Sequence, residues 1–103
     1  MLDNERVVLN SMKRKSIQDY PIGEVIGGVL KEKEMTQAEL SVRTKISPPV
    51  INDIVQGRRG ASPSQLVKIG FILGLDAFEL GRMQSDYEIM RIINPIIEKN
   101  QEE

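Results

Sequence analysis

The chain has 103 residues, which is enough for one domain with a modest all-helical core and too few for a separate catalytic domain. It contains no cysteine and no histidine, which excludes thiol nucleophiles, zinc sites built from those ligands, disulfides and the usual general base near neutral pH. No apolar run approaches the ~20 residues of a membrane span, and the first residues lack the apolar core of a signal peptide. We therefore expect a cytoplasmic protein with no membrane association, no catalysis and no cofactor.

The charge is almost balanced but unevenly distributed. The formal net charge is -1 and the pI is near 5.5, whereas nucleic-acid-binding domains are usually basic. Residues 36–60 nevertheless carry a net charge of +2, and residues 61–103 carry a net charge of -3. The central segment has Arg43, Lys45, Arg58 and Arg59 against Glu39 and Asp53. A dimer that presents two such centres would bind DNA with weak non-specific affinity.

The first twenty residues show no sustained helical period. They contain an apolar run at residues 7–9 and a basic run at residues 13–15, which we interpret as a solvated face rather than a DNA-binding arm. Disorder and a partner-docking arm are both open for this segment. The first clear helix is predicted over residues 22–33, after Pro21, with one apolar face formed by Val25, Ile26, Val29 and Leu30.

Residues 36–60 have the pattern of two short helices joined by a tight turn, a helix-turn-helix. Thr36 and Glu39 are spaced as a capping box at the start of the first helix, in which Leu40 points inward. Lys45 occupies the turn, and Ile46 is expected to be buried and to anchor the turn to the core. Ser47 is the expected N-cap of the second helix, with a hydroxyl that accepts from the N–H of Val50.

The second helix divides into two faces at about 100° per residue. Pro48 and Pro49 fit its first turn, where proline is tolerated because its missing N–H would have had no intrahelical partner. Gly57 is expected to end the helix in a left-handed conformation, followed by a loop with Arg58 and Arg59. The apolar face contains Val50, Ile51, Ile54 and Val55, and the opposite face contains Pro48, Pro49, Asn52, Asp53 and Gln56.

Three further pairs have capping-box spacing: Ser62 with Gln65, Asp76 with Glu79, and Ser85 with Glu88. They predict a helix from Pro63 to Gly74 with Leu66, Ile69 and Leu73 buried, a short helix over residues 77–83, and a last helix from residue 86 to about 99. The fold class is therefore all-α, a five-helix bundle around one small core with an additional C-terminal helix.

The last helix has an apolar face larger than a peripheral helix of a small domain needs: Ile89, Met90, Ile92, Ile93, Ile96 and Ile97. Pro95 removes one backbone hydrogen bond, so we expect a kink or a break near Asn94. The face either packs on its own core or forms a subunit interface. We favour the interface of a homodimer, because an exposed isoleucine patch of this size would aggregate.

Residues 22–80 resemble the Cro and phage-repressor type of helix-turn-helix domain, the XRE-like, lambda-repressor-like family. The segments INDIVQGRRGASP (residues 51–63) and ELGRMQSDYEIMRI (residues 79–92) are more similar to antitoxins of the HigA/VapI type. Together with the patterns above, the resemblance divides the chain into an N-terminal arm over residues 1–20, a helix-turn-helix DNA-binding domain over residues 21–83, and a C-terminal helix over residues 84–103 with a dimer interface and an acidic tail.

The resemblance also implies how DNA is contacted. Gln37 and the start of its helix would hold a phosphate, residues 47–53 would enter the major groove, and Arg58 or Arg59 would touch the flanking backbone. Pro48 and Pro49 offer only apolar contact, for instance to a thymine methyl, and Asp53 repels phosphate or accepts from a cytosine amino group. Asn52 and Gln56 are the better candidates for reading adenine. The predicted DNA-binding residues are Gln37, Lys45, Ser47, Pro48, Pro49, Asn52, Asp53, Gln56, Arg58 and Arg59.

The predicted function is that of a repressor that binds a palindromic operator on double-stranded DNA and serves as the antitoxin of a toxin–antitoxin pair. Residues 1–20 or the acidic C-terminal helix would contact a small basic ribonuclease toxin. The alternatives are a regulator with no toxin partner and an interaction module that has lost DNA binding. An enzyme is the weakest alternative, because Asp86 and Glu88 at i,i+2 do not face one another on a helix.

Overall fold

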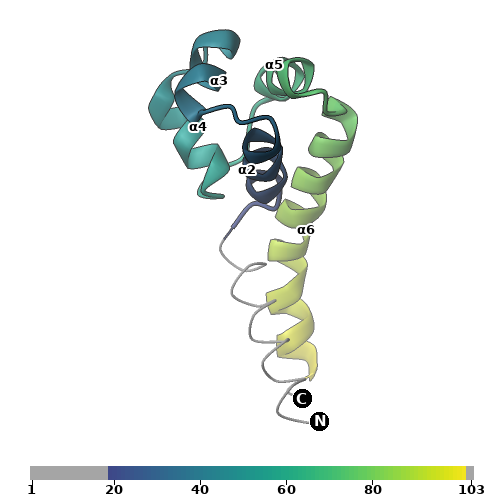
Figure 1. The fold of residues 1–103 in the computed structure, drawn as a ribbon. Helices are drawn as coiled ribbons and strands as arrows, with labels where there is room; N and C mark the ends of the chain where they lie inside the picture. Colours follow the sequence, from purple (N-terminus) through teal and green to yellow (C-terminus); the bar gives the residue numbers. More distant parts are fainter. Residues whose placement is uncertain (1–18, 102–103) are drawn as a thin grey trace, which may run out of the picture.

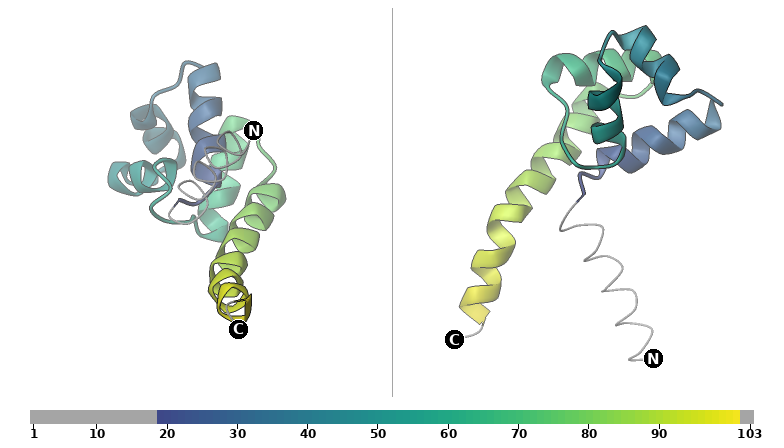
Figure 2. Two further views of the ribbon diagram at one scale, coloured as in Figure 1. Left: turned by 90° about the horizontal axis from the view of Figure 1, so that it is seen from below. Right: turned by 90° about the vertical axis from the view of Figure 1, so that its left-hand side faces the viewer.

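The computed structural model describes residues 19–101, which form five helices and no strand. These are α2 (Ile22–Glu32), α3 (Gln37–Thr44), α4 (Pro48–Val55), α5 (Pro63–Leu73) and α6 (Ala77–Gln101). Helices α2 to α5 and the start of α6 form a compact head, from which the rest of α6 projects (Figure 1; Figure 2). The expected arm over residues 1–20 lies almost wholly outside the described residues. Within the part that is described, no helix is both long and apolar enough to cross a membrane.

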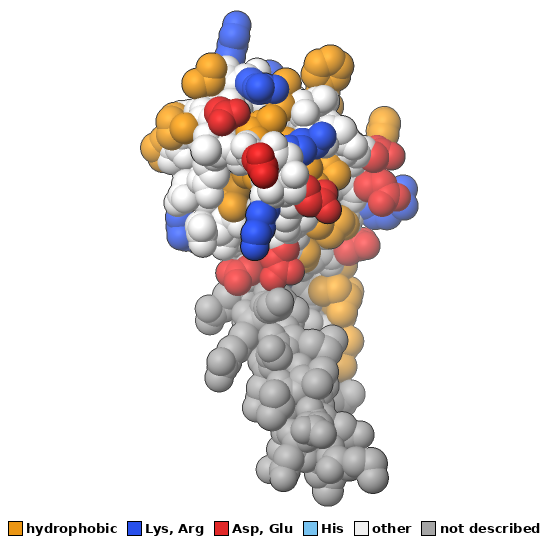
Figure 3. Space-filling view, viewed as in Figure 1, with side chains coloured by type: hydrophobic (Ala, Val, Ile, Leu, Met, Phe, Trp, Pro, Cys, Tyr) orange, Lys and Arg blue, Asp and Glu red, His pale blue; other side chains and the backbone are white. Residues whose placement is uncertain are grey.

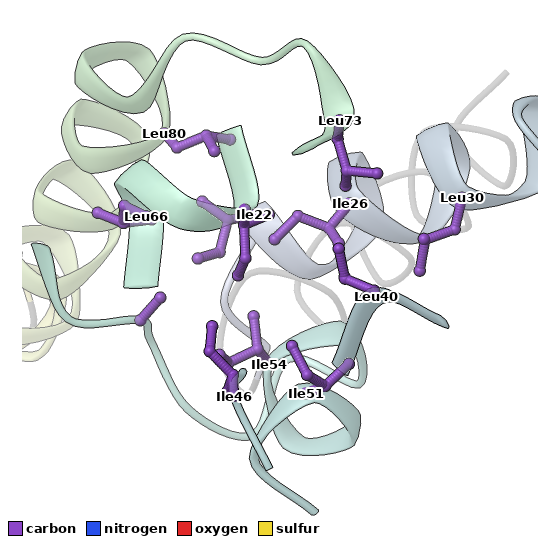
Figure 4. Close-up of a cluster of buried hydrophobic side chains, with 12 residues drawn as sticks. Ile22, Ile26, Leu30, Leu40, Ile46, Ile51, Ile54, Leu66, Leu73 and Leu80 are labelled. Atoms are coloured by element: carbon purple, nitrogen blue, oxygen red, sulfur yellow. The ribbon is translucent and has the colours of Figure 1, made fainter. Parts of the chain in front are cut away.

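The core lies where α2, α3, α4 and α5 meet. Six side chains from these helices have no or almost no exposed surface: Ile22, Ile26, Leu40, Ile51, Ile54 and Ile69. Figure 4 shows the first five of these converging with Leu66 and Leu73 of α5 and Leu80 of α6, and Ile69 belongs to the same cluster. The apolar faces predicted for the first helix and for α4 and α5 are therefore confirmed as the faces that pack against the core.

The predicted caps of α3, α4, α5 and α6 differ in how far they form. Ser62 and Gln65 form a complete capping box, and the Thr36 hydroxyl accepts from the N–H of Glu39 at 3.0 Å. Asp76 also caps, accepting from the N–H of Phe78 at 2.8 Å rather than from residue 79. The prediction for Ser47 is wrong in one respect, because Ser47 is the N-cap but its hydroxyl makes no cap hydrogen bond. The fixed φ of two successive prolines starts this helix without it.

Alanine substitutions should separate the caps that bond from the one that does not. Ser62→Ala and Thr36→Ala should each lower the free energy of unfolding by roughly 1 kcal/mol, because each deletes a hydroxyl that accepts an otherwise unpaired N–H. Ser47→Ala is the matched control and should cost less. Chemical denaturation followed by circular dichroism measures all three variants. If Ser62→Ala and Thr36→Ala unfold at the same denaturant concentration as the wild-type protein, these two helix starts are wrong.

Two predictions for the C-terminal third of the chain are wrong. Residues 77–101 form one continuous helix, so Ser85 does not open a new helix and Pro95 does not break the old one. Leu80 and Tyr87 are buried on the two sides of Ser85, and Gln84 between them is hydrogen-bonded to the head. Because these three residues share one face of a single helix, a break at Ser85 would disrupt the contact. Pro95 removes only one bond from a helix that is already established before it.

Candidate DNA interface

Helices α3 and α4 are joined by a turn whose polar groups are satisfied internally. Lys45 in this turn adopts the left-handed conformation with φ of +61°, which costs about 1 kcal/mol for a residue with a Cβ. The buried hydroxyl of Ser41 donates to the carbonyl of Ile46, and that of Thr44 donates to the carbonyl of Leu40 at 2.7 Å. The first bond ties the turn to α3, a role for Ser41 that the sequence pattern did not show, and the second lies within the last turn of α3.

The two faces of α4 are arranged as predicted. Ile51 and Ile54 are fully buried, whereas Pro48, Pro49 and Gln56 are exposed, and Asn52 and Asp53 are partly exposed. Ser47 and Lys45 before the helix are also exposed. Most of the residues predicted to contact DNA on α4 and its turn therefore lie on the surface, on the side opposite the core.

Four of the predicted DNA-binding residues are joined in one hydrogen-bonded network. The Asn52 amide donates to Oε1 of Gln37 at 3.1 Å, which links α4 to the N-terminus of α3. Arg58 donates from Nε to Oδ1 of Asp53 at 2.9 Å and from Nη2 to Oδ1 of Asn52 at 2.6 Å. Asp53 is thus paired with a cation, so the repulsion of phosphate expected from its isolated carboxylate is offset.

The end of α4 accounts for the position of Arg58. Gly57 is left-handed with φ of +79°, its N–H bonds to the carbonyl of Ile54 at 3.1 Å, and the N–H of Arg58 bonds to the carbonyl of Asp53 at 2.9 Å. These two bonds are those of a Schellman motif. The motif confirms the predicted role of Gly57 and returns the chain so that Arg58 begins beside Asp53.

The loop after α4 is held by residues that sequence reasoning did not identify as part of the site. The Gln84 side chain of α6 accepts from the N–H of Ala61 and donates to its carbonyl, both at 2.8 Å. On the other side of the loop, the N–H of Tyr20 donates to the carbonyl of Gly57 at 2.9 Å. Gln84 and Tyr20 therefore fix both ends of the loop that carries Arg58 and Arg59.

Tyr20 also connects this loop to α6. Its ring lies 4.6 Å from that of Tyr87, and the guanidinium of Arg91 lies 5.6 Å from the centroid of the Tyr87 ring. Burial raises the pKa of the Tyr20 phenol, and the nearby Glu88 carboxylate adds to this rise. The phenol is therefore neutral at physiological pH, and its ring adds an aromatic contact to the Leu80 packing and the Gln84 hydrogen bonds that hold α6 to the head.

The described surface is mixed in charge and carries large exposed apolar side chains. Figure 3 shows acidic and basic side chains interspersed over the head, with apolar side chains between them and along α6. Among the described residues, no group of three or more acidic side chains is placed to hold a metal ion. The six residues of the predicted interface are all at least 36% exposed, and three apolar residues of α5 and of the start of α6 are exposed without having been predicted: Val67, Phe71 and Phe78.

Comparison with known proteins agrees with this geometry. The chain is 27% identical to the Pseudomonas aeruginosa antitoxin HigA determined with the higBA promoter, with a TM-score of 0.68 over 79% of this chain and 89% of that one. A Pseudomonas aeruginosa protein in complex with its 28-base-pair operator DNA gives the same identity and TM-score, over 79% of this chain and 90% of that one. No curated protein sequence matches significantly. The helix-turn-helix family model matches residues 29–80, half of the chain, so this protein belongs to the helix-turn-helix family.

Proposed function

We propose that this protein is a transcriptional repressor that binds a palindromic DNA operator as a homodimer and is the antitoxin of a HigBA-like pair. The observation that carries the proposal is the α3–α4 unit, whose outward surface gathers Gln37, Asn52, Asp53 and Arg58. The likeness to an antitoxin determined with its own promoter supports both the DNA ligand and the class of protein. In this role the protein acts by binding in the cytoplasm and catalyses no reaction.

In the proposed mode of binding, the start of α3 holds a phosphate and α4 enters the major groove. Gln37 accepts from Asn52 through Oε1, and its own amide N–H groups donate to no described residue, so they are available to a phosphate oxygen. Pro48, Pro49 and Gln56 are exposed on α4 and lie on the surface that would face base edges. Lys45, Ser47 and Arg59 border that surface from the turn and the following loop.

The homodimer would form through the outward face of α6. Ile89, Ile92 and Ile96 are spaced by three and four residues and are 52%, 67% and 56% exposed, so they form an apolar stripe on one side of the helix. The flanking Met90, Ile93 and Ile97 widen this stripe. A two-fold axis here would place the two copies of α4 about 34 Å apart, or a multiple of that distance, as a palindromic operator requires.

The toxin would bind outside the α3–α4 unit. Residues 61–103 carry a net charge of -3, which suits a basic ribonuclease, and residues 1–20 are the other segment proposed for this contact. Co-expression with the reading frames that adjoin the gene tests this part. Co-purification of a small basic protein whose toxicity is relieved by this chain supports the antitoxin; DNA binding with no such partner would leave a regulator without a toxin.

Titration of fluorescent duplexes at several salt concentrations tests the DNA ligand. Arg59→Ala should weaken binding to every sequence alike and make the salt dependence shallower by about one unit, because it removes a phosphate contact that carries no sequence information. Lys68→Ala is the control, since it removes the same charge from the exposed side of α5. If the wild-type protein binds no duplex at low salt, the chain is an interaction module and not a repressor.

A further inference from the structure

The network on α4 fixes the guanidinium of Arg58 in a way that a solvated loop arginine would not show. Two of its nitrogens are engaged, Nε by Asp53 and Nη2 by Asn52, and the two acceptors are consecutive residues of one helix. The side chains of Arg58 and Asp53 are nevertheless 56% and 41% exposed. The plane of the guanidinium is therefore set by the protein while much of the group still faces solvent.

The backbone contributes to the same arrangement. The Schellman bond from the N–H of Arg58 to the carbonyl of Asp53 holds the two residues together through the backbone, in addition to the contact between their side chains. A Cβ on Gly57 would lie 2.8 Å from the Asp19 Cβ, so the turn is also enclosed from outside. Both the start and the end of the Arg58 side chain are thus positioned, and little rotamer freedom remains to be lost on binding.

Three of the five guanidinium donors remain available, two on Nη1 and one on Nη2. They form an edge that offers two roughly parallel N–H groups, which matches a pair of acceptors. In the major groove, N7 and O6 of guanine are such a pair. A pair of phosphate oxygens offers the same chemistry, but Arg58 is folded onto the outward face of α4 itself, the face proposed to enter the groove.

We propose that Arg58 reads a guanine in the operator and that Asp53 and Asn52 are the residues that position it. This inference rests on the proposed function, since it assigns roles within the same DNA interface. It changes the roles expected from the sequence: Asn52 already uses its amide nitrogen toward Gln37 and its oxygen toward Arg58, so it holds the reader in place, while Asp53 aims the reader instead of contacting cytosine.

Asp53→Asn distinguishes two roles of this carboxylate by the way in which DNA binding changes. A carboxylate that only repels phosphate would, when neutralised, tighten binding to all duplexes. A carboxylate that aims Arg58 would, when neutralised, lower discrimination between sequences. The experiment begins by selecting duplexes bound by the wild-type protein from a pool with a randomised core of about two helical turns. The selected duplex and a random duplex are then titrated with each variant.

We expect Arg58→Ala to lower the ratio of selected to random affinity roughly 10-fold, and Asp53→Asn to lower it in the same direction at the same G·C pair. Arg58→Lys keeps the charge but lacks the planar fork, so it should lose the same preference. Replacing that guanine by 7-deazaguanine, which lacks the N7 acceptor, should weaken the wild-type protein and leave Arg58→Ala unchanged. Arg59→Ala is the matched control and should weaken both duplexes equally.

Two results would overturn the inference while leaving the proposed function intact. One is that Asp53→Asn tightens both duplexes with discrimination unchanged, which would make Asp53 a simple repulsive charge. The other is that Arg58→Ala weakens both duplexes equally, which would make Arg58 a phosphate contact. A wild-type protein that binds no duplex would instead remove the proposed function. NMR of the free protein is independent of DNA: the Arg58 Nε–H should exchange slowly with solvent, and Asp53→Asn, which keeps an acceptor oxygen but loses its charge, should reduce that protection.

Discussion

Gly23→Ala is expected to lower the free energy of unfolding by at least about 2 kcal/mol, although it adds a single methyl group. A Cβ at this position would lie 2.6 Å from the carbonyl oxygens of Ile54 and Val55 and 3.1 Å from the nitrogen of Gly57. All three are backbone atoms, so no side-chain rotation relieves the overlap and α2 must move away from the end of α4. Thermal or urea denaturation gives the size of the effect.

Gly28→Ala is the matched control, because it makes the same change in the same helix. Nothing lies within 4 Å of a Cβ built on Gly28, which is exposed. Alanine is the better helix former, so this variant should be more stable than the wild-type protein by roughly 0.5–1 kcal/mol. Opposite signs for the two variants would support the close approach of α2 to α4; equal effects would contradict it.

The Gly23 contact matters to the site as well as to the fold. The atoms it approaches belong to the last turn of α4, where the Schellman motif brings Arg58 beside Asp53. A variant that relieves the overlap partly by moving the end of α4 would therefore also displace Arg58. We expect such a variant to lose sequence discrimination at temperatures where it is still folded.

The features that the sequence predicted correctly are local ones. The buried and exposed faces of α4 follow from a 3.6-residue period, and the left-handed conformation of Gly57 follows from its position after the last apolar residue. The complete capping box at Ser62 and Gln65 follows from a spacing of three residues. Each involves residues within one turn of helix, whose distance in space is fixed by their distance in sequence.

The features that the sequence did not predict depend on contacts between distant segments or on competition between them. Gln84 lies 23 residues from Ala61, and no spacing rule brings an α6 side chain to that backbone. The same contact explains why the cap expected at Ser85 failed, since a buried face that runs from Leu80 to Tyr87 favours one continuous helix over two. The sequence did not predict the Arg58 network for a related reason. Arg58 follows the helix, so the helical period does not say which residues its side chain contacts.

Converting Ile92 and Ile96 to aspartate is expected to make the protein monomeric and to weaken its binding to a palindromic operator by about 10²-fold or more. The two side chains are 67% and 56% exposed and are not part of the core cluster, so a folded monomer should survive the change. Facing carboxylates across a two-fold axis would repel one another and remain unpaired in an apolar interface. Light scattering or sedimentation measures the oligomeric state, and circular dichroism checks the fold.

Comparison of a full duplex with a half-site duplex shows whether the loss comes from dimerisation. A dimer holds its second α4 close to the second half-site, so the operator gains avidity that a half-site does not offer. The wild-type protein and the Ile92→Asp, Ile96→Asp variant should therefore differ on the full duplex selected by the wild type and bind one half-site equally. Val67→Asp, which places the same charge on an apolar α5 residue that is 59% exposed, is the control and should remain dimeric. If the double variant stays dimeric while Val67→Asp dissociates, the interface lies on α5, and the apolar stripe of α6 is free for another partner.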